Sequence, residues 1–203
     1  VKLNAPSLQT AALHDLGDIL GTAGMQAHAR LANVHAPQLH THDRFGRRID
    51  QVEFHPSYHA PMEGATGAGL HGTPFAASEQ ATCHAHTRRA AAFMMFTETE
   101  PSMLCPISMT YAVVPALRHN AELAKVYEPL LTNREYDPEL KLATTKAGIT
   151  SGMSMTEKQG GSDVRAGTSQ ATPNADGTYT LVGHKWFTSA PMCDIFLVLA
   201  QAP

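Results

Sequence analysis

Cysteine is scarce in this sequence of 203 residues, which contains only Cys83, Cys105 and Cys193, far apart from one another. An odd and scattered set provides neither the paired spacing of a disulfide framework nor the close spacing of a zinc site. We expect the three thiols to be buried as small apolar side chains. This cysteine usage fits a reducing compartment, and we expect the protein to be cytoplasmic.

Long apolar runs and an excess of one charge are also lacking. No run approaches the ~20 residues that span a bilayer, and no basic segment followed by an apolar one opens the chain, so we expect no membrane association. Lys and Arg number 15 against 18 Asp and Glu, which gives a formal net charge of −3. This balance offers no basic surface for nucleic acid.

The sequence does contain an ordinary globular share of hydrophobic residues, 43%, which is enough for one core or two modest domains. Apolar positions follow helical spacing up to about residue 148, and β-prone runs dominate after it. The pattern predicts an α+β chain, with a helical domain over residues 1–148 and part of a β domain over residues 149–203.

The helical part contains start and stop signals that divide it. Residues 43–56 are predicted to form a loop or small hairpin, and Thr73-Pro74 with residues 78–80 resembles a helix start. Helices are predicted over residues 7–34 and over residues 90–100, where Pro101 ends the second. A third has Pro106 in its first turn and an apolar stripe from Ile107 to Leu117. Shorter helices are predicted over residues 126–131 and 139–147.

The β part is predicted to contain a hairpin and further strands. Residues 174–177 form the turn signal between two short strands. The predicted strands are residues 168–172, 178–182, 184–189 and 194–200. The last of these is uniformly apolar and should be buried on both faces, which requires neighbours on both sides. Few residues follow this strand to supply the second neighbour. We therefore expect the sequence to be a fragment of a longer chain, or later residues not to have been observed.

Two patterns that suggest ligand sites are interpreted otherwise. Residues Gly67–Gly72 match GxGxxG, but no strand precedes them and Pro74 follows closely, so a flexible loop is predicted in place of a dinucleotide site. The twelve histidines form close pairs without a Cys or carboxylate at a zinc spacing, so surface or hydrogen-bonded roles and no metal site are predicted. These pairs are His40 with His42, His55 with His59, and His84 with His86.

The segment Met153–Asp163 carries a more distinctive pattern. A predicted strand ends at Met155, Thr156 places a hydroxyl at its tip, and Gly160-Gly161 lets the backbone approach a ligand closely. Ser162 adds a second hydroxyl. Such a loop suits a ligand rich in acceptors, such as a flavin edge or a diphosphate. By itself, however, a Gly-Gly-Ser-Asp sequence is more often a simple turn.

A second segment, Gly183–Ser189, follows the predicted hairpin. The return of a hairpin can bring its aromatic rings and hydroxyls beside the first loop. There, a ring can pack on a planar cofactor and a hydroxyl can bond a ring nitrogen. The alternative is that Trp186 and Phe187 are core residues of a strand.

Together, the order Met-Thr-Glu, Gly-Ser-Asp, hairpin and Gly-x-Lys with aromatic residues resembles the middle domain of acyl-CoA dehydrogenases. Lys158-Gln159 stands where ordinary members tend to have Pro-Gly, and this variant looks like the AidB-type branch linked to DNA-alkylation damage. Other stretches similar to that branch are residues 30–34, 46–50, 54–56, 104–110 and 183–187. The resemblance implies a helical N-terminal domain followed by the start of an antiparallel β-barrel-like middle domain, with the C-terminal helical domain missing.

The resemblance also implies roles for single residues. In that family the first loop and the later strand hold FAD. Thr156 matches the residue facing the pyrimidine edge of the flavin, Ser162 the one near the diphosphate and the substrate thioester, and Ser189 the one near flavin N5. Thr156 and Ser162 are therefore the implied substrate-binding residues. The implied cofactor-binding residues are Met153, Ser154, Met155, Thr156, Gly161, Ser162, Phe187 (where most members have Trp), Thr188 and Ser189.

No catalytic residue is expected in this sequence. The resemblance places the Glu that removes the α-proton in the missing C-terminal domain, and Glu157 is interpreted as structural. Many of the oligomer contacts and, in the AidB-type branch, the surface for duplex DNA are assigned to that same domain. The implied partners are thus an acyl-CoA substrate, duplex DNA and further copies in a homotetramer.

Two functions remain open at this point, beside a third possibility that these 203 residues alone hold no flavin and are inactive, because half of the pocket is missing. The first is an FAD-dependent dehydrogenase that oxidises the α,β bond of a short branched acyl-CoA such as isovaleryl-CoA. The second is a DNA-associated protective flavoprotein with little or no physiological dehydrogenase activity.

Overall fold

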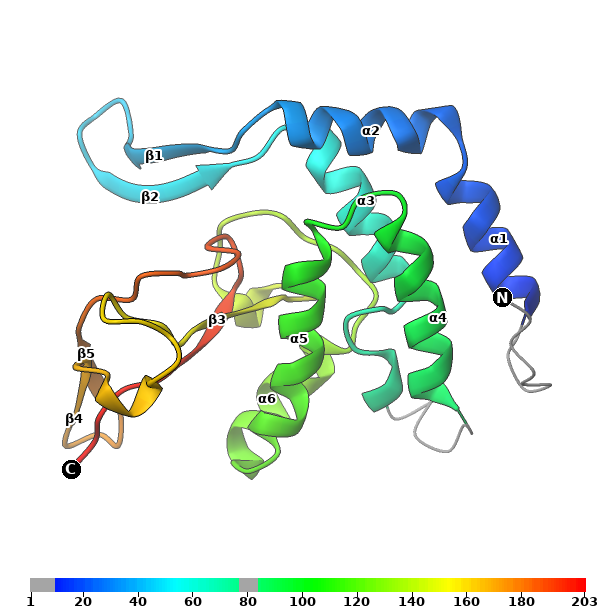
Figure 1. Cartoon of the computed structure of the whole chain (residues 1–203). Coiled ribbons are helices and arrows are strands. Elements are labelled where there is room, and N and C mark those ends of the chain that lie inside the picture. The colour runs from blue at the N-terminus through cyan, green and yellow to red at the C-terminus, as the bar shows by residue number, and fades with distance from the viewer. Residues whose placement is uncertain (1–9, 77–83) are drawn as a thin grey trace.

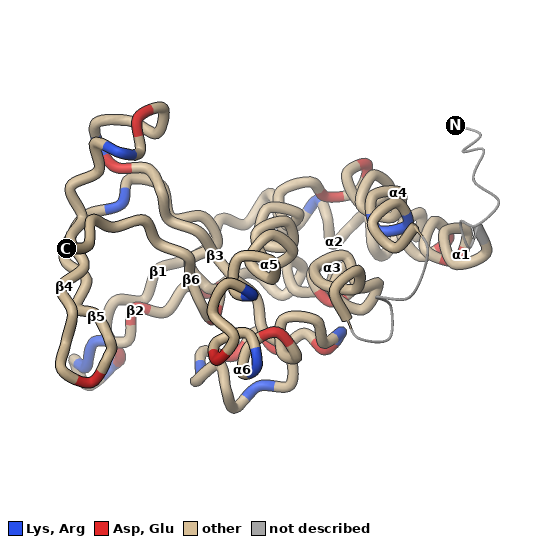
Figure 2. The backbone as a smooth tube through the Cα atoms, turned by 90° about the horizontal axis from the view of Figure 1, so that it is seen from below, with Lys and Arg blue, Asp and Glu red and all other residues tan. Residues whose placement is uncertain are grey.

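The computed structural model describes residues 10–76 and 84–203. Within these ranges, six α-helices form one part of the molecule, and three two-stranded sheets accompany them (Figure 1). The described helices contain none that is long and apolar enough to cross a membrane. Basic and acidic residues are interspersed along the chain, and neither sign gathers on one side (Figure 2).

The predicted helix over residues 7–34 is two helices, α1 (Thr10–Leu20) and α2 (Ala23–Val34). The break falls at Gly21-Thr22, where Thr22 adopts an extended conformation and its hydroxyl accepts a hydrogen bond from the Met25 N–H at 3.2 Å. A threonine that caps in this way starts a new helix, because it satisfies one of the unpaired N–H groups of the first turn. Residues 7–9 lie outside the described residues.

The loop or small hairpin predicted over residues 43–56 is the turn and second strand of an antiparallel pair, β1 (Gln38–His42) and β2 (Arg48–Glu53), whose first strand lies before the predicted range. Its turn is held by the Asp43 carboxylate, which accepts hydrogen bonds from the N–H groups of Phe45 and Arg47. Gly46 supplies the positive φ of 79° that the turn needs. The hairpin projects from the end of α2 and extends away from the helices (Figure 1).

Helix α3 (Pro56–Gly67) begins at a proline and ends within the GxGxxG-like segment. A helix and not a strand leads into that segment, so it lacks the strand–turn–helix context of a dinucleotide-binding fingerprint. The expected flexible loop is wrong, however. Leu70 and His71 are fully buried, and the turns between α3 and the 3₁₀ helix η1 (Thr73–Phe75) are packed into the core.

Three more helices follow: α4 (Ala85–Thr97), α5 (Leu104–Leu117) and α6 (Ala121–Leu131). Pro106 lies in the first turn of α5, as predicted, and α6 starts earlier than predicted because the Asn120 side chain caps it. The proposed start at residues 78–80 lies outside the described residues. A predicted helix over residues 139–147 is wrong, since only the 3₁₀ turn η2 (Ala143–Thr145) forms there. The following Lys146 side chain is drawn into a buried ion pair with Asp194 at 2.6 Å.

The cysteines divide between burial and exposure. Cys193 is buried, as expected, but Cys105 is exposed in the first turn of α5, where Leu104 and Pro106 take the core-facing positions. The expectation of a buried thiol is therefore wrong for Cys105. Cys83 lies outside the described residues.

Helix α5 packs on both parts of the molecule. One core cluster, which includes Met62, Phe96 and Ile107, joins α3, α4 and α5. A second cluster, which includes Val113 and Leu131, joins α5 and α6 to the sheet, with partly buried Ile195 and Leu197 against it. Sheet and helices therefore share a packed apolar boundary, which fixes the position of the strand ends.

The β part consists of two pairs of strands. β4 (Gln170–Pro173) and β5 (Tyr179–Val182) form the predicted antiparallel hairpin, whereas β3 (Ser151–Ser154) and β6 (Ile195–Val198) run parallel. The predicted strand at β6 is confirmed, but its burial on both faces is wrong. Within the described residues β6 pairs with β3 as its one neighbouring strand, and Val198 is 39% exposed.

Candidate functional site

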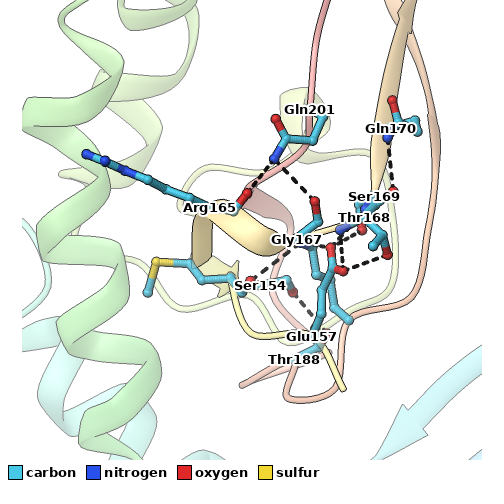
Figure 3. Close-up of polar contacts among 11 residues, drawn as sticks. Ser154, Glu157, Arg165, Gly167, Thr168, Ser169, Gln170, Thr188 and Gln201 are labelled. Atoms are coloured by element: carbon cyan, nitrogen blue, oxygen red, sulfur yellow. Dashed lines mark hydrogen bonds and ion pairs between the residues drawn. The ribbon is translucent and has the colours of Figure 1, made fainter. Parts of the chain in front are cut away.

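The two distinctive segments lie side by side. Met153 of β3 and Ser189 form an isolated antiparallel bridge. The Ser154 hydroxyl donates to the Thr188 hydroxyl at 2.9 Å (Figure 3). The Trp186 N–H donates to the Thr156 carbonyl, also at 2.9 Å. These three contacts confirm that the chain returns beside the first loop.

This return is not a strand, so the prediction for residues 184–189 is wrong. Outside the bridge to Met153, the residues have no ladder partner among those described. Two contacts explain the irregular path. The Trp186 N–H is used by the first loop, and the Lys185 side chain turns inward. A positive φ of 53° at Ala190 then ends the segment.

The Glu157 side chain holds the first loop in place through hydrogen bonds to neighbouring segments. Its side chain is 3% exposed and accepts five hydrogen bonds, four of which come from the backbone N–H groups and hydroxyls of Thr168 and Ser169, at 2.6 to 2.9 Å (Figure 3). The fifth comes from the Lys185 ammonium at 2.9 Å. One carboxylate thus joins the loop to the start of β4 and to the second segment.

The hydrogen bonds from the Thr168 N–H, the Lys185 ammonium and Ser169 hold the pKa of the Glu157 carboxyl far below its usual range. A carboxylate whose lone pairs are filled by five donors has no site left for a substrate proton. The geometry thus supports the interpretation of Glu157 as structural.

Gln201 closes the same loop region on its outer side. Its side-chain amide donates to the carbonyls of Arg165 and Gly167 at 3.0 and 3.2 Å (Figure 3). Its backbone N–H donates to the Ser169 carbonyl, and its carbonyl accepts from the Ala171 N–H, both at 2.8 Å. The loop is therefore held at both of its ends by the chain itself.

Gly161 lies under the Thr156 side chain. A Cβ at position 161 would lie 2.7 Å from the Thr156 hydroxyl oxygen, so an alanine there would displace that hydroxyl. Gly160, with a φ of 122°, completes a tight turn that also bridges back to Glu157. Both glycines are needed for this shape, one for its backbone angle and the other for its missing Cβ.

The aromatic residues of the second segment are exposed. Trp186 is 53% and Phe187 66% exposed, and their rings meet edge to face with centroids 6.2 Å apart. The alternative that they are core residues of a strand is wrong. Met155, 50% exposed, adds a further apolar side chain to the surface around the two segments.

Three hydroxyls of the site remain available to a ligand. Within the described part of the chain, the side chains of Thr156, Ser162 and Ser189 make no hydrogen bond. The hydroxyls of Ser154 and Thr188, by contrast, are bonded to each other. Unpaired hydroxyls beside exposed rings fit a planar ligand with polar edges, so the residues present are compatible with a flavin.

The structure thus assembles part of the predicted site and adds to it. Met153, Ser154, Met155 and Thr156 lie along β3 and its tip, Gly161 and Ser162 lie on the exposed turn after it, and Phe187, Thr188 and Ser189 lie on the returning segment. The positioning residues Thr168, Ser169 and Gln201 were missed, because nothing in their local sequence indicates that they contact Glu157 or the loop. The Gly-x-Lys pattern contains Lys185 but gives no indication of its ion pair.

The histidine pairs have hydrogen-bonding and packing partners. His40 bonds Glu53 at 2.7 Å, His55 caps α3 through the Ser57 N–H, and His59 bonds the Tyr136 hydroxyl at 2.8 Å. Among the residues that the structure describes, no group of three or more His, Cys, Asp and Glu could hold a metal ion.

Comparison with known proteins matches both parts of the chain. Residues 1–138 match the model of the adaptive response protein AidB N-terminal domain, and residues 152–203 match that of the acyl-CoA dehydrogenase middle domain. The chain is 45% identical to the acyl-CoA dehydrogenase homologue AidB of Escherichia coli (strain K12), over 93% of this chain and 35% of that protein. It is 28% identical to acyl-CoA dehydrogenase family member 11 of Caenorhabditis elegans, over 94% of this chain and 30% of that protein. The chain thus spans about a third of the length of these relatives.

Solved structures show the same arrangement. The crystal structure of Caenorhabditis elegans ACDH-11 in complex with C11-CoA superposes with a TM-score of 0.78 at 28% identity, over 95% of this chain and 32% of that one. Butyryl-CoA dehydrogenase from Megasphaera elsdenii, at 18% identity and a TM-score of 0.62, shares the fold over 98% of this chain and 45% of that one. The helical domain followed by the start of a sheet domain is therefore the arrangement found in acyl-CoA dehydrogenases.

Proposed function

Because the chain belongs to the acyl-CoA dehydrogenase family, in its AidB-type branch, we propose that it is the front part of an FAD-dependent oxidoreductase acting on acyl-CoA. The substrate we propose is a short branched thioester such as isovaleryl-CoA, oxidised at its α,β bond. The observation that supports this most directly is the group of unpaired hydroxyls, Thr156, Ser162 and Ser189, beside exposed aromatic rings on a fastened loop.

FAD, when bound, would supply a hydride acceptor for the β-carbon of the thioester. In this proposal the chain's own residues bind and orient. Thr156 and Ser189 donate hydrogen bonds to polar edges of the ring system, and Phe187 covers apolar surface beside it. Ser162, on the exposed turn, would hold the diphosphate and the thioester end of the substrate. The group that removes the α-proton would come from a part of the protein outside this chain.

The acyl-CoA class is supported by a relative, since ACDH-11 has been solved with C11-CoA. Our proposal further includes a cytoplasmic homotetramer, with any contact to duplex DNA made through a C-terminal domain outside this chain. Basic and acidic residues are interspersed along the described backbone (Figure 2), so we place any contact with DNA outside this portion.

The test is an anaerobic visible spectrum of the full-length protein before and after adding isovaleryl-CoA. We expect a bound flavin whose absorbance falls on addition. A bound flavin that stays oxidised at saturating thioester would remove the dehydrogenase activity from the proposal and leave the DNA-associated flavoprotein as the better function. Absence of flavin after reconstitution with FAD would overturn both.

A variant pair tests the residue assignments. Thr156→Val removes one unpaired hydroxyl and should weaken FAD binding several-fold, whereas Thr172→Val, at an exposed position of β4, should leave it unchanged. Equal FAD affinity in the two variants would show that Thr156 does not contact the cofactor.

A further inference from the structure

A second site is indicated by an open cleft between α1, α3 and α4. Its volume of about 510 Å³ is within the range of about 300–1,000 Å³ that small-molecule sites occupy. In both views these helices lie on the opposite side of α5 from β3, which leads into the first of the two flavin-loop segments, Met153–Asp163 and Gly183–Ser189 (Figures 1 and 2). The cleft is therefore separate from the candidate flavin site.

Small residues create the space in this cleft. Its lining includes Gly64, Gly67, Ala68, Gly69, Ala12, Ala85 and Ala92. A Cβ at Gly67, the last residue of α3, would meet nothing within 4 Å. Larger side chains from α1 and α4 form the walls, among them Leu13, Leu16 and Phe96. The interior is therefore mostly apolar, with room beside α3.

The rim of the cleft is cationic. Among the described lining residues are three arginines, Arg88, Arg89 and Arg134, and one carboxylate, that of Asp15. The guanidinium of Arg134 has no hydrogen bond or ion pair within the described residues. That of Arg89 is anchored, since its Nε donates to the Leu70 carbonyl at 2.7 Å and its Cζ lies 3.8 Å from the centre of the Tyr111 ring. With Arg89 fixed in place and Arg134 free to form new hydrogen bonds, this rim favours binding of an anion such as a carboxylate.

A buried polar atom in the lining also has no partner. The Thr73 hydroxyl oxygen is shielded from solvent and makes no hydrogen bond in the described part of the chain. It lies against Gly69, where a Cβ would collide with it, and Gly69 has a φ of 75°. Buried hydroxyls are normally hydrogen-bonded, so an unpaired one in a cleft indicates a place for a polar group of a ligand.

From this combination we infer that the cleft binds a single-chain amphiphile with a carboxylate head, that is, a free fatty acid. The alkyl chain lies along the apolar floor beside Gly67, and the carboxylate lies between Arg134 and the Thr73 hydroxyl. Burial of the chain provides the main driving force, and the guanidinium selects the charged head. Occupancy here is independent of the flavin and its thioester.

The experiment is a calorimetric titration of the full-length protein with dodecanoate, kept below its micelle concentration. We expect one equivalent bound per chain. Gly67→Leu, which fills the open space, should weaken binding at least tenfold, and Arg134→Met should weaken it several-fold while Arg134→Lys retains most of it. Gly24→Leu is the matched control, because a Cβ at this glycine of α2 also meets nothing within 4 Å, and it should bind as the wild type does.

Three results would overturn the inference. One is no binding of dodecanoate by the folded protein. Another is equal affinity in the Gly67→Leu and Gly24→Leu variants, provided that both melt at the wild-type temperature. The third is displacement of dodecanoate by saturating isovaleryl-CoA, which would place the fatty acid in the thioester site.

Discussion

The Lys185 ammonium lies 2.9 Å from a Glu157 carboxylate oxygen, although 28 residues separate the two in the chain, and both side chains are largely buried. This pair joins the two segments that carry the candidate flavin site. A buried ion pair of this kind is sensitive to loss of one partner, because the other charge remains away from water. The predictions for this pair follow from the cost of leaving either charge buried without its partner.

Replacing either partner should destabilise the β part, but not equally. Glu157→Gln places an amide N–H against the donors of Thr168 or Ser169. Lys185→Met, by contrast, leaves in place all four hydrogen bonds that Glu157 accepts from Thr168 and Ser169. We therefore expect a lower melting temperature for both variants, with the larger decrease for Glu157→Gln. Circular dichroism of the purified variants measures this.

The control for this pair is an exposed lysine. Lys141, whose side chain is 38% exposed, pairs with Asp137 and Glu139, and such surface pairs contribute little to stability because water screens them. Lys141→Met should thus melt close to the wild type. A Lys185→Met variant that is no less stable than Lys141→Met would contradict the role given to the buried pair.

The low pKa of Glu157 predicts a loss of stability in acid. Its ordinary value is 4.5 and the folded-state pKa is far lower, so the unfolded chain binds the proton first. The stabilisation is fully present above pH 4.5 and decreases as the pH falls below it. Urea unfolding between pH 6 and pH 3 should show the wild type losing its advantage over Glu157→Gln. A constant difference across that interval would exclude this explanation.

His71 predicts a second pH dependence in a higher interval. Burial lowers its pKa from 6.5 to about 4, and the charges of Arg134 and Arg89 act in the same direction. Because the folded pKa is depressed, the unfolded chain binds a proton below pH 6.5 that the folded chain does not bind until about pH 4. The free energy of unfolding should fall by up to about 3 kcal/mol over that interval.

Urea unfolding at pH 7 and pH 5 measures the His71 effect. His71→Gln keeps a donor for the Asn133 carbonyl, which the His71 Nε2 bonds at 2.7 Å, but cannot titrate. Its stability should vary less between the two pH values than that of the wild type. His119→Gln, at an exposed position, is the matched control, and identical pH slopes for the two variants would refute the assignment.

The parallel pairing of β3 and β6 requires a glycine at position 152. A Cβ there would lie 2.3 Å from the Phe196 ring, so Gly152→Ala should destabilise the protein by about 1–3 kcal/mol. Adding Phe196→Leu should recover part of that loss. Gly24→Ala, in an open part of α2, should instead be neutral or stabilising. Chemical denaturation of the four proteins measures this, and a double variant no better than Gly152→Ala would locate the strain elsewhere.

Much of the fold follows from local signals in the sequence. The turn residues at 174–177 predict the β4–β5 hairpin, and Pro106 predicts the start of α5, because proline and turn residues act on their immediate backbone. The order of the two distinctive segments also predicts the family and hence the arrangement of the domains.

What the sequence could not predict depends on contacts between distant residues. The helix expected at residues 139–147 does not form, while Lys146 pairs with Asp194 from the other end of the β part. The strand expected at residues 184–189 is replaced by bonds to Glu157 and Thr156. No periodicity in either segment contains information about those partners. The exposed Trp186 and Phe187 likewise indicate a ligand surface only once their neighbours are known.

The side chains of Glu157, Lys185 and Gln201 hold the first loop through hydrogen bonds to its own chain, so we expect the loop to take its shape when the protein folds. A ligand that arrives there meets hydroxyls already in position and loses only its own freedom of motion. Apoprotein and complex should then share one loop conformation, and association should proceed in a single step whose rate rises in proportion to ligand concentration. A site of this kind is preorganised, and its selectivity is determined by the shape that it has before any ligand binds.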